Sequence, residues 1–411
     1  RLIARNRNMS LRGVLGLAVT WIILAVSGLH VGQGESVASA SAGQAALDQI
    51  RTIAAGASDQ QRFDAAAAVD RFRHAAGGKL LTGLRGKDVL LVFVESYGRV
   101  AIEGLPSSPR LRAVLDTGTR RLRTSGYSSR SAFLTSPTFG GLSWLAHATL
   151  QSGLWVDNER LHDRLLSGRR MTLSSAFNRA GWRTLAMMAS NDAGWPQGKA
   201  FYQFDDIYNR WDIAYRGPSF GWSAVPDQYV LSTFHQRVLG KPGRAPVMVE
   251  IDLSSSHPPW APVPRLVDWS RLGHGSVYDG MQSRSRSARQ LWRHPAKVEA
   301  AYVKSIAYSL ESLISFVQKY GDDDLVLVML GDHAPATIVS GHGASHDVPI
   351  TVVARDPSVI DRIAGWGWQT GMRPDHQAPL WRMDAFRDRF LAAFSPELRP
   401  TPGPPAAPSE P

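Results

Sequence analysis

Five segments of the chain are short runs of apolar residues with few polar interruptions. They cover residues 88–96, 182–190, 246–254, 324–330 and 347–355. Strands that are buried on both faces of a parallel sheet show continuous runs of this kind, whereas half-exposed strands alternate apolar and polar residues. The five segments are therefore predicted to be buried strands of one sheet.

Helical patterns separate these segments, most clearly at residues 298–321, before the fourth segment. Apolar residues there recur at helical spacing and form one stripe: Tyr302, Ile306, Leu310, Leu313 and Val317. Gly321 is predicted to end this helix. The alternation of strands and helices over residues 85–395 predicts one α/β domain, with a doubly wound, mostly parallel sheet and helices on both faces.

The amino-terminal part of the chain indicates a membrane anchor. Residues 13–34 contain no Asp, Glu, Lys or Arg and are long enough to cross a bilayer as a transmembrane helix. Four arginines precede the segment: Arg1, Arg5, Arg7 and Arg12. By the positive-inside rule, residues 1–12 form a basic cytoplasmic segment and the large domain is extracytoplasmic. The alternative is a secretory signal peptide, with the small residues 36–43 as its cleavage region. We favour the uncleaved anchor, which places the protein in the cell membrane.

Two further segments lie outside the predicted domain. Residues 35–84 are rich in Ala and are interpreted as a linker that contains a helix, and the Pro-rich residues 396–411 as a disordered tail. The chain begins with Arg rather than Met, which leaves room for further membrane spans before it in a longer protein.

Charge and cysteine content narrow the classes of partner. The chain carries 46 Lys and Arg against 35 Asp and Glu, a net charge of +11, which suits a protein that lies beside anionic lipid or polymer. No zinc-finger or aromatic RNA-binding signature is present, so no nucleic-acid partner is predicted. The absence of cysteine excludes disulfides and thiol chemistry.

Polar residues gather where the predicted strands end. In open α/β sheets, ligands bind beyond the carboxyl ends of the strands. The acids and histidines at these ends and in the loops that follow are Glu95, Asp252, His257, Asp332, His333, His342 and His346. Oxygen and imidazole ligands without thiolate suit Mn²⁺, Mg²⁺ or Zn²⁺. The sequence therefore predicts a divalent metal site at this edge of the sheet.

A nucleophile is predicted at Ser143. Gly140 and Gly141 permit a tight loop, after which Ser143 opens a helix. A serine at this position can simply cap the helix. The same position also offers free backbone amides to an anion such as phosphate, and a nearby metal would lower the pKa of the hydroxyl.

Four motifs in this order resemble the alkaline phosphatase/sulfatase superfamily over residues 85–360. They are the strand ending in Glu95, the Gly-Gly-x-Ser helix start, Ser-Ser-Ser-His-Pro-Pro at 254–259, and Gly-Asp-His-Ala-Pro at 331–335. Within the superfamily the chain looks most like the membrane-anchored branch of lipoteichoic acid synthases and phosphoethanolamine transferases.

The resemblance implies a set of site residues. By motif, one divalent metal, with Mn²⁺ favoured, falls on Glu95, Ser143, Asp332 and His333, and Ser143 is the catalytic nucleophile. The phosphate-contacting histidine of the branch falls on His257.

The chain departs from the branch at two points. Ser143 stands where lipoteichoic acid synthases have threonine. The Trp-x-Arg substrate contact of those enzymes is replaced by a segment in which Trp195 and Lys199 are the candidates.

The resemblance implies a membrane-anchored phosphotransferase or phosphoester or phosphodiester hydrolase. Its substrate would be an envelope phospholipid head group or glycopolymer, and it would work through a phospho-serine intermediate. Transferase and hydrolase both stay open. The alternatives are a sulfatase-like sulfuric ester hydrolase and a catalytically inactive binding relative. The formylglycine route of sulfatases is not expected, because the chain lacks both Cys and a Ser-x-Pro-x-Arg motif.

A second metal is the remaining alternative. Many superfamily members hold one, and by motif its ligands would be Asp252, His257 and His346. Two neighbouring metals can clamp the attacking and leaving oxygens of a phosphoryl transfer. The favoured expectation is a single metal, with His257 and His346 facing the substrate phosphate.

Overall fold

The computed structural model describes residues 58–283 and 288–398, together with positions 16, 20, 30, 31, 35 and 36. The predicted membrane helix at 13–34 and the predicted tail beyond residue 398 fall almost entirely outside this part of the chain. Within the described residues, no helix is both long and apolar enough to span a bilayer.

The chain divides into two compact units, residues 1–69 and residues 70–411. In the first unit the two-residue strands β1 (His30–Val31) and β2 (Glu35–Ser36) pair antiparallel, and residues 58–68 are helical. The second unit begins before residue 85, the expected boundary. Phe72, Leu80 and Leu81, which fall within the predicted linker 35–84, are buried in its core.

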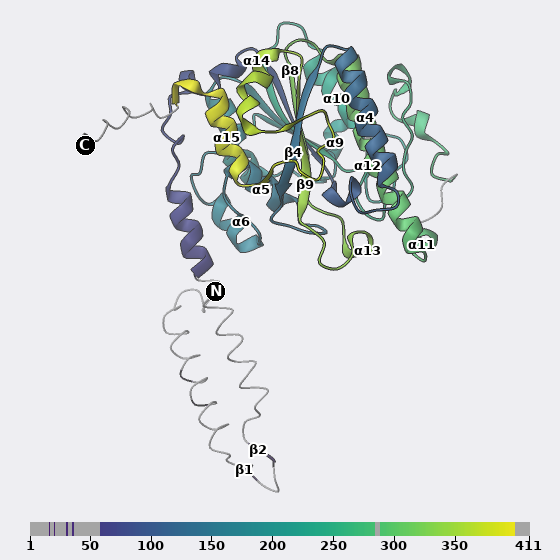
Figure 1. Cartoon of the computed structure of the whole chain (residues 1–411), viewed down its shortest axis with the longest axis horizontal. Helices are drawn as coiled ribbons and strands as arrows, with labels where there is room; N and C mark the ends of the chain where they lie inside the picture. Colours follow the sequence, from purple (N-terminus) through teal and green to yellow (C-terminus); the bar gives the residue numbers. More distant parts are fainter. Residues whose placement is uncertain are drawn as a thin grey trace, which may run out of the picture. The chain divides into compact units, whose positions relative to one another are not determined.

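A nine-stranded sheet forms the centre of the second unit (Figure 1). Its strands are β3 (Asp88–Val94), β4 (Ser128–Thr135), β5 (Arg183–Met188), β6 (Asp206–Asn209), β7 (Val247–Leu253), β8 (Leu325–Gly331), β9 (Asp347–Ala354), β10 (Gln369–Thr370) and β11 (Leu380–Arg382). The spatial order is β10-β4-β9-β8-β3-β7-β5-β6, and β11 also pairs with β4. The five predicted segments are all strands, and β9 and β10 run opposite to the other seven.

The direction of β9 corrects one expectation, because residues 347–355 had been grouped with the parallel strands. Parallel neighbours need a long crossover, usually a helix that covers the sheet. The connection from β8 to β9 contains only the four-residue helix α13 (Thr337–Ser340), so the chain turns back antiparallel. The start of β9 therefore lies at the same edge of the sheet as the carboxyl ends of β8 and β4.

Helices cover both faces of the sheet, as the alternating pattern predicts. They are α4 (Ser108–Thr124), α5 (Ser143–Ser152), α6 (Glu159–Leu166), α7 (Leu173–Arg179), α8 (Pro196–Tyr202), α9 (Arg210–Ile213), α10 (Asp227–Phe234), α11 (Ala288–Leu291), α12 (Pro295–Tyr320), α14 (Pro357–Arg362) and α15 (Ala385–Phe394). Short 3₁₀ segments are η1 (Gly77–Lys79), η2 (Thr82–Leu84), η3 (Arg99–Ala101), η5 (Trp269–Arg271), η6 (Ser276–Tyr278), η7 (Ala364–Trp366) and η8 (Pro396–Leu398), and η4 (His235–Leu239) is a π-helix. The helix predicted at 298–321 is α12, and its apolar stripe is fully buried.

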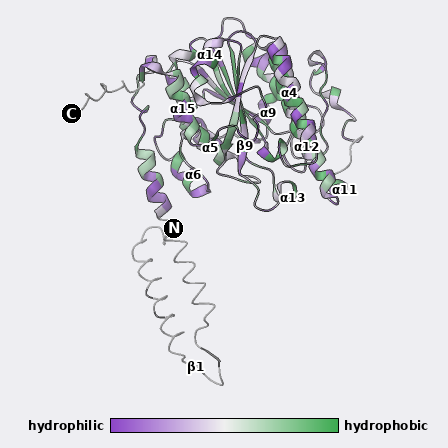
Figure 2. Ribbon diagram, viewed as in Figure 1, coloured by the Kyte–Doolittle hydropathy of each residue, from purple (hydrophilic) through white to green (hydrophobic). Residues whose placement is uncertain are grey.

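Each strand contributes alternate side chains to two separate cores. In β3, Leu90, Val92 and Val94 pack with α4, α10 and α12. The residues between them, Val89, Leu91 and Phe93, pack with α5, α7, α14 and α15. Figure 1 shows α4 and α12 on one side of the sheet and α14 and α15 on the other, and Figure 2 shows the apolar colouring concentrated in the strands between them. In β3, the alternate residues Val89, Leu91 and Phe93 therefore lie on the side of the sheet that α5 covers.

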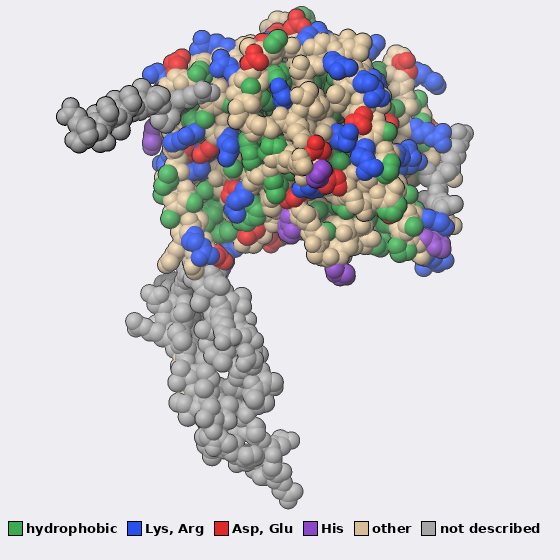
Figure 3. Space-filling model, viewed as in Figure 1, with side chains coloured by type: hydrophobic (Ala, Val, Ile, Leu, Met, Phe, Trp, Pro, Cys, Tyr) green, Lys and Arg blue, Asp and Glu red, His purple; other side chains and the backbone are tan. Residues whose placement is uncertain are grey.

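The surface does not gather its positive charge on the face that Figure 3 shows. Lys and Arg side chains there are interspersed with acidic, apolar and uncharged groups. On that face the positive side chains are thus mixed with other groups rather than gathered in one stripe.

Candidate functional site

Alternation along the strands brings the predicted acids to the α5 side of the sheet. Glu95 continues the parity of Val89, Leu91 and Phe93, and Asp332 continues that of Val326, Val328 and Leu330 on the neighbouring strand β8. Both acids follow the last residue of their strand, so both carboxylates lie at the carboxyl edge. Helix α5 starts above this edge with Ser143.

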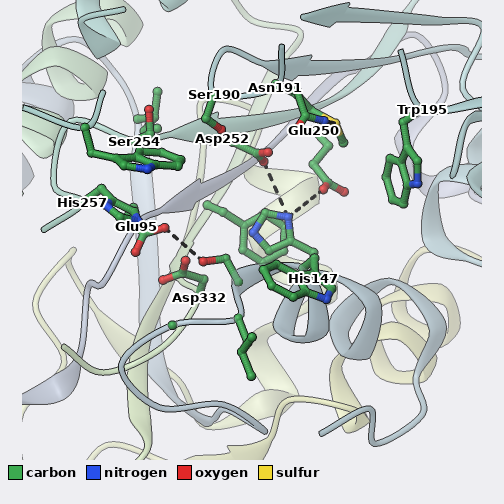
Figure 4. Close-up of a pocket in the computed structure, with 18 of the residues that line it drawn as sticks. Glu95, His147, Ser190, Asn191, Trp195, Glu250, Asp252, Ser254, His257 and Asp332 are labelled. Carbon is green, nitrogen blue, oxygen red and sulfur yellow. Dashed lines mark hydrogen bonds and ion pairs between the residues drawn. The ribbon is translucent and has the colours of Figure 1, made fainter. Parts of the chain in front are cut away.

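Four side chains meet at this point, and Figure 4 labels two of them, Glu95 and Asp332. The Ser143 hydroxyl donates to Oε2 of Glu95 at 3.0 Å and lies 3.3 Å from Nε2 of His333. Nε2 of His333 is 3.4 Å from Oε1 of Glu95 and 3.6 Å from Oδ2 of Asp332. Glu95, Asp332 and His333 offer one ligand atom each within 4.8 Å of one another, as a metal site requires. The residues that the sequence marked as metal ligands are thus neighbours, although they span most of the chain.

Backbone groups hold the carboxylates and the imidazole in place. Oδ1 of Asp332 accepts from the amides of Ser96 and His333, both at 2.7 Å. The Ser96 hydroxyl donates to Oε1 of Glu95 at 2.7 Å. Nδ1 of His333 donates to the carbonyl of Ala334 at 2.8 Å, so Nε2 is the ring nitrogen that faces the cluster. A metal-binding histidine needs this tautomer.

The backbone is strained beside the nucleophile. Leu142 and Ser96 adopt the left-handed region, with φ of 64° and 58°, which non-glycine residues rarely occupy. Such strain persists only where the surroundings enforce it and is common at functional sites. Gly140 precedes Leu142 at φ 72°, where a Cβ would lie 3.3 Å from the Cα of Ala336. Ser143 is the first residue of the helix, after the N-cap Leu142, and its hydroxyl bonds to Glu95 and lies beside His333 in the cluster.

Burial and charge leave the cluster short of a cation. Burial raises the pKa of Asp332, and the charge of Glu95 raises it further, to about 6. Burial also opposes ionisation of Glu95, but the charges of His333 and His257 outweigh it and hold the pKa of Glu95 below its usual value. A divalent ion would neutralise both carboxylates at once, and the oxygen and nitrogen donors present fit Mn²⁺, Mg²⁺ or Zn²⁺.

A second cluster, which the sequence analysis did not assemble, lies beside the first. Nδ1 of His147, on α5, is 3.0 Å from Oε1 of Glu250 and 3.6 Å from Oδ1 of Asp252, both on β7. Burial lowers the pKa of His147, but Asp252 and Glu250 outweigh it and raise that pKa to about 9. The available signals were the i, i+4 spacing of His147 from Ser143, and two acids of the same parity in an otherwise apolar strand.

Among the described residues, the alternative set for a second metal, Asp252, His257 and His346, does not come together as a group of possible metal ligands. Asp252 instead joins His147 and Glu250, and these three are themselves spaced as a second group of possible metal ligands. His346 is exposed, and its ring lies 5.2 Å from that of Phe139.

His257 and Trp195 line the cavity in front of Ser143, while Lys199 is exposed and does not line it. Trp222 stacks on His257 at 3.8 Å, and Nδ1 of His257 donates to the carbonyl of Pro258 at 2.7 Å. These contacts fix the ring and its tautomer.

The cavity itself has a volume of about 710 Å³. Its walls combine aromatic side chains, such as Trp144, Trp195 and Trp222, with the acids of both clusters. No Lys or Arg is among its described lining residues. An anionic group bound there would depend on the histidines, on backbone amides and on a metal for its positive partners.

Comparison with known proteins identifies the fold. No family model matches the chain, and no curated protein matches its sequence. The solved lipoteichoic acid synthase LtaP from Listeria monocytogenes aligns over 76% of this chain and 73% of its own, with a TM-score of 0.51 and 13% identity. The similarity confirms the resemblance drawn from the four motifs as far as the fold is concerned.

Two other solved structures are similar at lower scores. The Streptococcus pyogenes phosphoglycerol transferase GacH, in complex with sn-glycerol-1-phosphate, aligns over 86% of this chain and 88% of its own, with 12% identity and a TM-score of 0.46. The periplasmic domain of EcEptC from Escherichia coli aligns over 75% and 82%, with 15% identity and a TM-score of 0.47. The fold assignment rests on LtaP.

The first cluster predicts the metal content of the protein. We expect one divalent ion per folded chain, lost in Asp332→Asn but retained in Glu250→Gln, which alters only the second cluster. Plasma mass spectrometry after equilibration with Mn²⁺ measures this, and a chelator should lower the melting temperature of the wild type but not of Asp332→Asn. A content near two that falls to one in Glu250→Gln would contradict the single site.

Buried Asp227 anchors the loop that carries His257. Its Oδ1 accepts from the amide of Ser255 at 2.9 Å, its own amide donates to the Ser255 hydroxyl at 3.0 Å, and Oδ2 accepts from Ser309 at 2.5 Å. Burial raises the pKa of Asp227 from 3.8 to about 6, although these hydrogen bonds oppose the change. The folded protein therefore binds this proton more tightly than the unfolded chain.

This shift predicts a pH dependence of stability that Asp227→Asn removes. Because the folded pKa is raised, the stabilisation is present at low pH and is lost as the pH rises through about 6. Between pH 5 and pH 7.5 the wild type should lose about 1 kcal/mol of unfolding free energy relative to Asp227→Asn. Urea unfolding of both proteins at the two pH values measures the difference, and parallel pH profiles would refute the assignment.

Proposed function

We propose that this chain is a metal-dependent phosphotransferase, or a phosphoester or phosphodiester hydrolase, that works through a phospho-Ser143 intermediate. One observation carries the proposal. The Ser143 hydroxyl stands at the strained start of α5, unused by its helix, and it is 3.0 Å from Glu95 and 3.3 Å from His333. A structural serine would not need this setting, whereas a nucleophile does.

Glu95, Ser143, Asp332 and His333 would hold one divalent metal, and Mn²⁺ is our first choice. When bound, such an ion lowers the pKa of a hydroxyl and stabilises charge on phosphoryl oxygens. The fit rests on the donor types, on their mutual spacing and on the excess of buried carboxylate charge. The ring of His333, fixed by Ala334, presents the nitrogen that such an ion requires.

The residues around Ser143 supply the other steps of the reaction. Oγ of Ser143 attacks phosphorus as its proton moves to Oε2 of Glu95 along the existing hydrogen bond. His257, oriented by Trp222 and Pro258, lies at the wall of the cavity and would bind a phosphoryl oxygen. An acceptor hydroxyl, from water or from a second substrate, then takes the phosphoryl group from Ser143.

The proposed substrates are phospholipid head groups or glycopolymers of the cell envelope. Two features support this choice. The chain shares its fold with LtaP, and residues 13–34 are predicted to anchor an extracytoplasmic domain to the membrane. Trp195 lines the cavity and is proposed to contact the group attached to phosphorus. Roles for the exposed Lys199 and His346 would require a substrate that extends beyond the cavity.

Replacing the nucleophile should abolish turnover without unfolding the protein. We expect Ser143→Ala to lower kcat/KM for an aryl phosphodiester at least about a thousand-fold. Its unfolding free energy should change by less than about 1 kcal/mol, because no helix cap is lost. Ser152→Ala, on the same helix but outside the cavity, is the matched control and should remain active.

The same assay separates the reaction classes. The wild type should act on the aryl phosphodiester and not on the corresponding aryl sulfate. Near-normal turnover by a folded Ser143→Ala protein would overturn the nucleophile, and a preference for the sulfate ester would overturn the phosphoryl chemistry.

A further inference from the structure

His147 lies one helical turn after Ser143 on α5, and both side chains line the same cavity. Its ring stacks on Phe93 with centroids 3.7 Å apart and planes 13° apart. Phe93 also lies two residues before Glu95, on the same face of β3. The stacking therefore ties the position of His147 to the strand that carries the first cluster.

A chain of hydrogen bonds orients the ring. Glu250 is only 3% exposed, and its Oε2 accepts from Nε2 of Gln151 at 2.5 Å. Oε1 of Gln151 accepts in turn from the amide of Ser174 at 2.9 Å, which fixes the direction of the Gln151 amide. Oε1 of Glu250 then faces Nδ1 of His147 at 3.0 Å. A proton on Nδ1 of His147 can be donated to this oxygen, which orients the ring with Nε2 away from Glu250.

The second ring nitrogen of His147 has no hydrogen bond within the described part of the chain. The ring lines the cavity and its side chain is 13% exposed, so solvent or substrate can reach it. Figure 4 shows the ring between the two acids of β7 and the Glu95–Asp332 side of the pocket. A histidine with Nδ1 held by a carboxylate and Nε2 free toward a substrate is the arrangement that proton transfer uses.

The proposed function includes two proton transfers for which no residue has yet been named as proton donor or acceptor. Glu95 takes the proton of Ser143, but the oxygen that leaves phosphorus still needs a proton, and the acceptor hydroxyl must lose one. His162 also lines the cavity, but among the described residues its Nε2 has no hydrogen-bond partner and no carboxylate bonds to its ring. His257 uses Nδ1 on a backbone carbonyl rather than on a carboxylate. Of these three histidines, His147 is the one whose ring nitrogen contacts a carboxylate, that of Glu250.

We propose that His147 is the acid–base residue of the reaction and that Glu250 is its positioning residue. This inference rests on the proposed function and adds the proton donor to it. The two carboxylates of β7 favour the protonated ring before the reaction starts. His147 is thus set to act first as an acid and then as a base.

The protons balance over the two steps. In the first, the Ser143 oxygen bonds to phosphorus, the bond from phosphorus to the leaving oxygen breaks, Glu95 takes the Ser143 proton, and Nε2 of His147 gives its proton to the leaving oxygen. In the second, the acceptor oxygen bonds to phosphorus and gives its proton to Nε2. The bond between Ser143 and phosphorus breaks, and the serine oxygen recovers its proton from Glu95. Both residues return to their starting states.

The test compares two leaving groups on one transferred phosphoryl group, phenol and the activated p-nitrophenol, in His147→Asn. The asparagine amide keeps a donor toward Glu250 but has no titrating nitrogen at the cavity. We expect turnover of the phenyl ester to fall about 10²- to 10⁴-fold, because its leaving oxygen needs a proton. Release of the first p-nitrophenol should fall less than about tenfold. Phospho-Ser143 should then accumulate, since the second step lacks its base, and mass spectrometry of the intact protein detects it.

Two variants complete the design. Glu250→Gln should show the same dependence on leaving group with a smaller loss, and it carries the test if His147→Asn does not fold. His162→Gln, in the same cavity, should change the rates of both esters by the same factor.

Two outcomes separate the failures. Equal loss on both esters in His147→Asn, without accumulation of phospho-Ser143, would reduce His147 to a structural residue and overturn the inference. Failure of the wild type to turn over either ester would instead overturn the proposed function itself.

Discussion

Two carboxylates, that of buried Asp332 and that of half-buried Glu95, lie side by side at the ends of adjacent parallel strands, and the site is built around them. The register of β3 and β8 pairs Val94 with Gly331, so Glu95 and Asp332 follow as neighbours on one face. Like charges in that position destabilise a sheet unless other groups compensate. The amides of Ser96 and His333, the Ser143 hydroxyl and the His333 ring all lie against them. This compensation is incomplete without a cation, which is why a metal-assisted nucleophile is the best account of the site.

The acids on β7 meet the same constraint in another way. Glu250 and Asp252 also share a face of their strand, but there the imidazole of His147 supplies the positive charge from within the chain. On the proposed account, the first carboxylate pair binds the divalent ion, while the second pair is paired with the imidazole of His147. On this account the one-metal site and the acid–base role of His147 have a common origin, since the residue that occupies the second cluster is also the residue that can exchange a proton with substrate.

The sequence predicts structural features that depend on local patterns of apolar and polar residues. It does not predict those that depend on which strands and helices lie next to one another. Apolar runs identify buried strands, and the polar residues that follow these runs identify the site. The sheet, Glu95 and Asp332 could therefore be predicted from the sequence. Strand β4 begins Ser-Ser-Arg-Ser and lacks an apolar run, and the direction of β9 depends on its neighbours. Glu250 gains its meaning only from the histidine that α5 places over it, a contact between segments about a hundred residues apart. The superfamily motifs suggested His346 for a second metal, but in this fold it is exposed.

The central claim is that Ser143 carries the phosphoryl group between donor and acceptor, and the stereochemical course at phosphorus tests it most directly. A phosphodiester made chiral at phosphorus by sulfur substitution would be turned over with an alcohol acceptor, or in isotopically labelled water so that the product stays chiral. The configuration of the product would then be compared with that of the substrate. Attack by Ser143 followed by attack by the acceptor inverts phosphorus twice, so the account predicts net retention. Net inversion would mean a single direct displacement by the acceptor and would contradict the account.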